Sequence, residues 1–192
     1  MMLRFGILYQ LMGKRRTNME RSIEIIDNFL PEELHTIIKN TMMGSDFPWF
    51  LLKYKVGEGL IEETPLEDSR IDFQFTHSFY KNFSPQSHMF NLLVPLLDKL
   101  KPSALIRVKG NLTVYSEKNL DYHYHIDTEE HVQCKTAIYY VNTTNGPTKF
   151  ETGEIVDCVE NRIVIFDNRI RHTGTTCTDE KTRCVLNFNY YQ

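Results

Sequence analysis

The stretch Lys135-Thr-Ala-Ile-Tyr-Tyr-Val-Asn142 is rich in β-branched and aromatic residues, the composition typical of a β-strand. Similar short runs lie on both sides of it in the C-terminal half, and turn-rich spacers separate them. These runs cover residues 106–108, 112–115, 149–151, 155–158, 162–166 and 183–190. Short strands at this spacing predict an antiparallel sandwich or barrel.

The N-terminal half has a different pattern. Residues 22–26 alternate as a strand, and Asx residues, Pro31 and two glutamates then predict a helix that ends near Gly44. A second helix is predicted around residues 90–97, with a kink at Pro95. Further strands are predicted over residues 49–56 and 71–75. Two helices that accompany a run of strands indicate helices packed on the outside of a sheet.

Length and composition indicate one globular domain. The chain has 192 residues, of which 41% are hydrophobic and 24% charged, so it can bury a core of its own. We assign residues 21–192 to a single domain and residues 1–20 to an N-terminal extension.

Charge, hydropathy and cysteine spacing exclude several classes of protein. The net charge is −3, which argues against a dedicated nucleic-acid binder. No apolar run approaches the length of a membrane span. None of the four cysteines forms a C-x-x-C pair, so a zinc ribbon is not expected. Without a visible signal peptide, we expect a soluble cytoplasmic protein with reduced thiols. Its oligomeric state stays open.

The segment Asp121-Tyr-His-Tyr-His-Ile-Asp127 carries the strongest chemical signal. In a strand, residues two apart point to the same face, so His125 and Asp127 can reach one cation. His172 follows the predicted strand at 162–166 and can supply a third ligand. Two histidines and one carboxylate form the facial triad of non-haem Fe(II) oxygenases, which leaves metal positions open for a co-substrate and O₂.

The same residues allow two other interpretations. His123 also shares a face with His125, so a cupin-type site could bind Zn, Mn, Ni or Cu without 2-oxoglutarate chemistry. Glu129, Glu130 and His131 would then be further ligands. A barrel that only binds a partner is the second alternative. Arg183, in the last predicted strand, separates the readings, because a cupin without an oxo-acid co-substrate has no evident need for it.

The ordered combination of His125-x-Asp127, His172 and Arg183 resembles the Fe(II)/2-oxoglutarate-dependent dioxygenases, and most of all their prolyl-hydroxylase branch. The resemblance covers about residues 105–190. It includes the segments 136–142, 146–150 and 163–167, which are similar to strands of that branch. It implies a mainly β (α+β) fold, a double-stranded β-helix or jelly-roll with N-terminal supporting helices.

The resemblance also implies a ligand set. His125, Asp127 and His172 would hold iron, 2-oxoglutarate would chelate it, and Arg183 would anchor the far carboxylate. A buried carboxylate needs a paired cation, and a guanidinium offers a planar match with two donors. Asn187 lies on the same strand face as Arg183 and could add a polar contact to the bound acid.

Two tyrosines are further candidates for contact with the co-substrate. The resemblance points to Tyr115, ten residues before His125, and to Tyr140. Because Tyr139 and Tyr140 are adjacent in a predicted strand, they face opposite ways, and we expect Tyr140 to enter the barrel. The alternative is that these rings pack in the core or at its rim.

The implied reaction is an O₂-dependent hydroxylation of a C–H bond that converts 2-oxoglutarate to succinate, with ascorbate as a possible reductant for the iron. The branch favours a peptidyl proline as substrate, and a free amino acid or other small molecule is the alternative. A nucleic acid or a membrane is not expected as a partner. Tyr122, His123 and the loop at residues 57–70 are candidates for substrate contacts.

Overall fold

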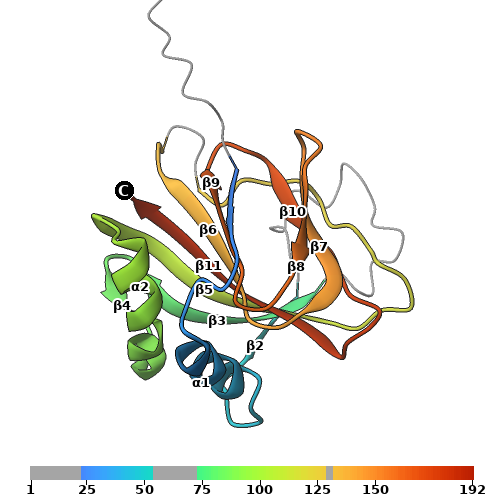
Figure 1. The fold of residues 1–192 in the computed structure, drawn as a ribbon, viewed down its shortest axis with the longest axis horizontal. Coiled ribbons are helices and arrows are strands. Elements are labelled where there is room, and N and C mark those ends of the chain that lie inside the picture. Colours follow the sequence, from blue (N-terminus) through green and yellow to red (C-terminus); the bar gives the residue numbers. More distant parts are fainter. Residues whose placement is uncertain (1–22, 54–72, 129–131) are drawn as a thin grey trace, which may run out of the picture.

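The computed structural model describes residues 23–53, 73–128 and 132–192, and two antiparallel β-sheets form its centre (Figure 1). The large sheet has the strand order β1-β9-β6-β11-β5-β3-β2, with β4 paired to β3, and the small sheet has the order β10-β7-β8. The strands are β1 (Glu24–Ile26), β2 (Phe50–Leu52), β3 (Gln74–Lys81), β4 (Ser84–Pro85), β5 (Ala104–Val114), β6 (Lys135–Tyr140), β7 (Thr144–Phe150), β8 (Ile155–Cys158), β9 (Ile163–Asp167), β10 (His172–Gly174) and β11 (Thr182–Tyr191).

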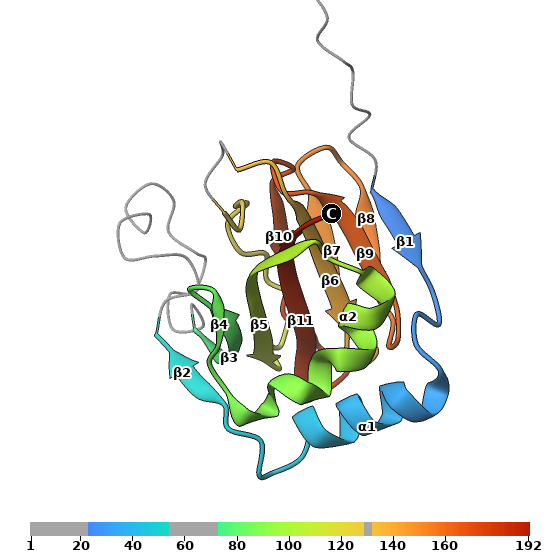
Figure 2. The same ribbon diagram turned by 90° about the vertical axis from the view of Figure 1, so that its left-hand side faces the viewer.

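Helices α1 (Glu32–Met42) and α2 (Val94–Leu100) cover one face of the large sheet, and the 3-10 helix η2 (His88–Leu93) leads into α2 (Figure 2). Every second side chain of the central strands points toward them. Leu186 and Phe188 of β11 are fully buried on this side, together with Ile38 and Met42 of α1 and Leu96 of α2. The hydrophobic effect of this layer holds the helices to the sheet.

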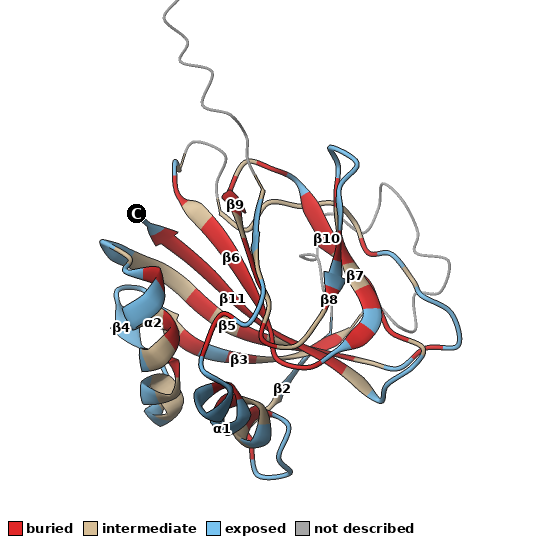
Figure 3. Ribbon diagram, viewed as in Figure 1, coloured by how far each residue is buried: buried red, intermediate tan, exposed pale blue. Residues whose placement is uncertain are grey.

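The opposite face of the large sheet packs against the small sheet. Ile138 and Tyr140 of β6 and Val185 of β11 contact Phe150 of β7 and Phe166 of β9 in this second core. Red buried segments therefore line both layers in Figure 3. Two facing antiparallel sheets with helices on the outer face of one confirm the predicted mainly β jelly-roll with supporting helices.

Several strand predictions are wrong in their boundaries. Residues 106–108 and 112–115 belong to one strand, β5, which runs unbroken through Gly110. A Cβ atom at Gly110 would lie 3.2 Å from both Met42 and Trp49. Glycine at this position therefore lets these two side chains pack closely against β5, and it does not mark a turn. Strand β3 is longer than predicted, and the three residues of β10 were not predicted.

The helix termini also differ from the prediction. Pro31 occupies the N-cap of α1, and no side chain caps this helix, so the predicted Asx caps are not used. Pro95 lies in the first turn of α2, where its missing N–H breaks no helical hydrogen bond, so it does not kink a longer helix. The predicted extension and the loop at residues 57–69 lie outside the described residues.

No helix in the described part of the chain is long and apolar enough to span a membrane. The four cysteines are buried free thiols.

Candidate metal centre

His125, Asp127 and His172 converge at one end of the space between the two sheets. Their ligand atoms all lie within 4.8 Å of one another. Nε2 of His125 is 3.9 Å from Oδ1 of Asp127, and Nε2 of His172 is 3.7 Å from Oδ2. The structure thus brings together the three predicted ligands, and His123 is not part of this group.

Backbone pairing puts the two histidines side by side. The segment before Asp127 is not the regular strand that we expected, because only isolated bridges occur in it. One of these bridges joins His125 to His172, with both N–H···O distances at 3.0 Å. Their rings lie 4.8 Å apart. A single antiparallel bridge to the short strand β10 therefore sets the separation of the two imidazoles.

The hydrogen bonds of the imidazoles suit metal binding. Nδ1 of His125 lies 3.1 Å from the carbonyl oxygen of His123, and Nδ1 of His172 lies 3.3 Å from that of Ile170. A carbonyl oxygen can only accept, so each Nδ1 carries a proton. This tautomer presents the lone pair of each Nε2 toward Asp127, as metal-binding histidines require.

Three side chains of the large sheet hold Asp127. Arg107 donates to Oδ1 at 2.9 Å, while Asn187 and Asn189 donate to Oδ2 at 2.9 and 3.3 Å. Burial raises the pKa of Asp127, but His172, Arg107, His125 and the hydrogen bond from Asn187 outweigh burial and hold this pKa far below its usual value. The carboxylate is therefore anionic and oriented at any physiological pH.

A cavity of about 280 Å³ extends from these residues to Arg183. Arg183 is buried, and it donates from Nε to the carbonyl oxygen of Gly146 at 2.7 Å and from Nη2 to Oγ1 of Thr148 at 3.0 Å. A Cβ atom at Gly146 would lie 3.0 Å from Cδ of Arg183, next to the guanidinium, and one at Gly174 would lie 3.2 Å from Nη1 of Arg183. Glycine at both positions makes room for the guanidinium.

Orphaned polar atoms in the cavity wall fit a polar ligand. Oδ1 of Asn111, Oγ1 of Thr113 and Oδ1 of Asn187 are buried without a hydrogen-bond partner among the described residues, and all three residues line the cavity. Buried polar groups in folded proteins almost always have partners. The two imidazoles and the carboxylate suit a divalent metal, and Arg183 with the hydroxyl of Thr113 can donate to an oxo-acid that chelates it, whereas the two amide oxygens can only accept.

The two adjacent tyrosines of β6 face opposite ways, as expected. Tyr140 is fully buried on the cavity side, where its hydroxyl donates to Oγ1 of Thr148 at 2.8 Å and its ring lies 5.7 Å from the guanidinium carbon of Arg183. Burial raises its pKa to about 12. The hydroxyl of Tyr139 lies 2.7 Å from Nδ1 of His35 on the helix side.

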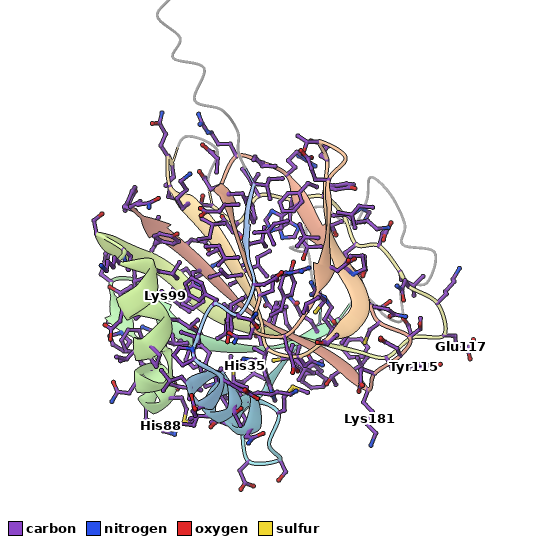
Figure 4. All side chains as sticks on the ribbon, viewed as in Figure 1. His35, His88, Lys99, Tyr115, Glu117 and Lys181 are labelled. Atoms are coloured by element: carbon purple, nitrogen blue, oxygen red, sulfur yellow. The ribbon has the colours of Figure 1, made fainter. Side chains whose placement is uncertain are left out.

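The other candidate residues lie elsewhere or contact different groups. Tyr115 is 51% exposed and projects beside Lys181 at the outer end of the molecule (Figure 4), because β5 ends at Val114 and the chain turns away. This position does not allow the predicted contact with a ligand in the cavity. Asn187 contacts Asp127, and this contact differs from the predicted contact with a bound acid.

The predicted substrate contacts do not line the cavity. Tyr122 is buried, and His123 is half-buried and contacts His125 through its backbone oxygen. Neither side chain is part of the cavity wall. Glu129, Glu130 and His131 lie outside the described residues, as does the loop at residues 57–70.

Sequence reasoning missed the contribution of β5. Arg107, Lys109, Asn111 and Thr113 all line the cavity. Alternate residues of a strand share a face, so a polar residue at every second position of this segment was the available signal. Splitting β5 into two short runs hid that pattern.

Comparisons with known proteins agree with this architecture. No protein-family model and no curated protein matches the sequence. Among solved structures, the fold is similar to that of a prolyl hydroxylase from Trichoplax adhaerens in complex with a hypoxia-inducible-factor peptide, with 12% identity, a TM-score of 0.64 and coverage of 89% of this chain and 84% of that one.

Two further structures show the same similarity. A 2OG-Fe(II) oxygenase family oxidoreductase from Burkholderia pseudomallei has 10% identity and a TM-score of 0.62, with 91% of this chain and 87% of that one covered. A viral collagen prolyl hydroxylase from Paramecium bursaria Chlorella virus 1, in its 2OG complex, has 14% identity and a TM-score of 0.56, with 88% and 96% covered. The chain therefore has the jelly-roll fold found in prolyl hydroxylases and other 2OG-Fe(II) oxygenases.

Proposed function

We propose that the protein is an Fe(II)- and 2-oxoglutarate-dependent oxygenase that hydroxylates a C–H bond. The observation that carries the proposal is the placement of the His125, Asp127 and His172 ligand atoms in one cavity with the buried guanidinium of Arg183. A facial triad alone suits several metals. The guanidinium of Arg183 in the same cavity favours a site that binds an oxo-acid co-substrate over a cupin-type metal site.

In this proposal His125, Asp127 and His172 hold iron. When bound, iron with 2-oxoglutarate would supply the oxidising power for the hydroxylation, which no side chain of the protein provides. An O₂ requirement and a benefit from ascorbate belong to the same proposal.

The side chains of the cavity orient and shield the reactants. Arg183 is positioned to pair with the far carboxylate of 2-oxoglutarate, and its bonds to Gly146 and Thr148 orient the guanidinium. The ring of Tyr140 packs beside this guanidinium. Arg107 and Asn187 hold Asp127 as an oriented anion, so this carboxylate would be ready to bind a metal.

For the substrate we propose a peptidyl proline. Two of the similar structures are prolyl hydroxylases, and one of them was solved with a peptide. A free amino acid remains the alternative, and the two can be compared directly in one assay.

The test measures metal uptake and succinate formation by the purified protein. Wild type should bind about one Fe(II) or Mn(II) per chain and convert 2-oxoglutarate to succinate slowly without substrate and faster with a proline-containing peptide. His172→Ala should lose both metal uptake and turnover. His88→Ala is a matched control, because His88 lies at the start of η2 away from the cavity (Figure 4). A wild-type protein that binds no divalent transition metal would contradict the proposal.

A further inference from the structure

Three cationic side chains line the cavity, and the proposed metal centre and co-substrate account for two of them. Its wall includes Arg107, Lys109 and Arg183, and Asp127 is its single carboxylate among the described residues. Arg107 is paired with Asp127, and Arg183 is assigned to the far carboxylate of 2-oxoglutarate. Within the described part of the chain, no hydrogen bond or ion pair engages the ammonium group of Lys109.

Lys109 stands close to the metal centre. On β5 it pairs in register with Asn187 of β11, whose side chain bonds Asp127 at 2.9 Å. Facing side chains at such a pair are about 5 Å apart at Cβ. On its other side Lys109 pairs with Ser78 of β3, which is exposed. Lys109 therefore lines the cavity on β5, between the strand that carries Asn187 and the exposed position of Ser78.

The position of Lys109 is electrostatically unfavourable in the absence of an anion. Burial, with a smaller contribution from Arg107, lowers the pKa of Lys109 to about 8, and the Asp127 carboxylate offsets this shift only in part. The side chain is still mainly protonated at neutral pH. A partly buried cation without a partner is costly, and pairing it with an anion removes much of that cost.

We propose that the primary substrate carries a carboxylate and that Lys109 binds this group. The inference rests on the proposed function and extends it, since it defines the substrate as an acid. Two sources share this chemistry, namely the α-carboxylate of a free amino acid and an acidic side chain next to the target residue in a peptide. Asn111, with its unpartnered Oδ1 in the same wall, could orient an N–H or O–H group of the same substrate.

The experiment compares acids with their amides. Calorimetry would measure binding to the protein loaded with Mn(II) and 2-oxoglutarate, with L-proline against L-prolinamide as one pair and N-acetyl-Glu-Pro-amide against N-acetyl-Gln-Pro-amide as the other. We expect one pair to show binding of the acid at least about tenfold tighter than that of its amide, as for a hydrogen bond between charged groups. The pair that discriminates identifies the source of the carboxylate.

Variants then assign the effect to Lys109. Lys109→Met should bring the ratio of acid to amide affinity close to one, and Lys109→Arg should retain the preference. Lys181→Met, an exposed lysine outside the cavity (Figure 4), should behave as wild type. In Lys109→Met the dissociation constant of 2-oxoglutarate should change less than about twofold, because Arg183 binds that acid.

Three results would overturn the inference. The first is equal or undetectable binding of acid and amide in both pairs. The second is an unchanged preference in Lys109→Met. The third is weaker 2-oxoglutarate binding in that variant, which would place Lys109 in the co-substrate site. A failure of the proposed function has a different signature, namely no uptake of Mn(II) or 2-oxoglutarate by wild type. In that case the same acid and amide pairs, titrated against the metal-free protein, decide the role of Lys109.

Discussion

The two faces of strand β11 have opposite chemistry although their residues alternate along one stretch of chain. Cys184, Leu186 and Phe188 point to the helices and are fully buried among apolar side chains. Arg183 and Asn187 point to the cavity, where they bond to polar groups. One face packs in the apolar core and the other lines the cavity. Substitutions on the two faces should therefore separate stability from ligand binding.

The largest effect is expected on the helix face. Phe188→Ala removes a fully buried ring from the layer beneath the helices and should lower the free energy of unfolding by about 3–5 kcal/mol. Urea denaturation followed by circular dichroism measures this loss. Asn187→Ala, one residue away on the cavity face, is the matched control and should change stability much less. Similar losses of stability in both variants would contradict the different roles assigned to the two faces of β11.

Arg183→Met tests the cavity face. Removing one partner of a buried charge pair costs about 2–5 kcal/mol, so the dissociation constant of 2-oxoglutarate should rise by at least about tenfold. Metal affinity without 2-oxoglutarate should stay near that of wild type, because Arg183 does not contact the three ligand residues. Unchanged 2-oxoglutarate binding would remove the anchor role.

Asn187→Ala should weaken the metal centre itself. Asn187 donates to Oδ2 of Asp127, and loss of a side chain that orients a metal ligand weakens metal affinity by about 10–100-fold. Competition with a chelator of known affinity measures the effect. Asn145→Ala changes an asparagine in an exposed region and serves as the control. Equal metal affinity in both variants would show that Asn187 does not support Asp127.

The adjacent tyrosines of β6 provide a smaller and sharper test. Tyr139→Phe loses the hydroxyl contacts with His35 and Asn161 and should destabilise the fold by about 1 kcal/mol without changing 2-oxoglutarate affinity. Tyr140→Phe loses its bond to Thr148, beside Arg183, and should weaken 2-oxoglutarate binding a few-fold. Paired denaturation and binding measurements check both. A reversed pattern would mean that the two faces are assigned the wrong way round.

A separate effect is expected in the pH dependence of stability. The pKa of Lys109 is lowered to about 8, whereas an unfolded lysine keeps a value near 10.5. Between these values the unfolded chain binds more protons than the folded one, so the Lys109 contribution should raise stability as pH increases from 8 to 10.5. The wild-type free energy of unfolding, taken relative to Lys109→Met, should be greater at pH 10 than at pH 7. No change in this difference would contradict the lowered pKa.

Several features of the site were predictable because local patterns encode them. Period-two alternation predicts that Arg183 and Asn187 share a face and that Tyr139 and Tyr140 do not, since a strand has no other way to direct its side chains. Spacing within the segment 121–127 predicts that His125 and Asp127 can meet. The prediction failed for Tyr115, because sequence spacing does not show where β5 ends and the chain turns outward.

The sequence by itself determined the mainly β class, the helix layer and the four side chains proposed for metal and acid binding, because alternation and residue chemistry are local properties. Only the tertiary structure showed that Arg107 holds Asp127, that Gly146 and Gly174 make room for the guanidinium, and that Lys109 lines the cavity without a hydrogen bond or ion pair to any described residue. These facts depend on contacts between residues far apart in the chain. Strand register and sheet packing set such contacts, and no local pattern encodes them.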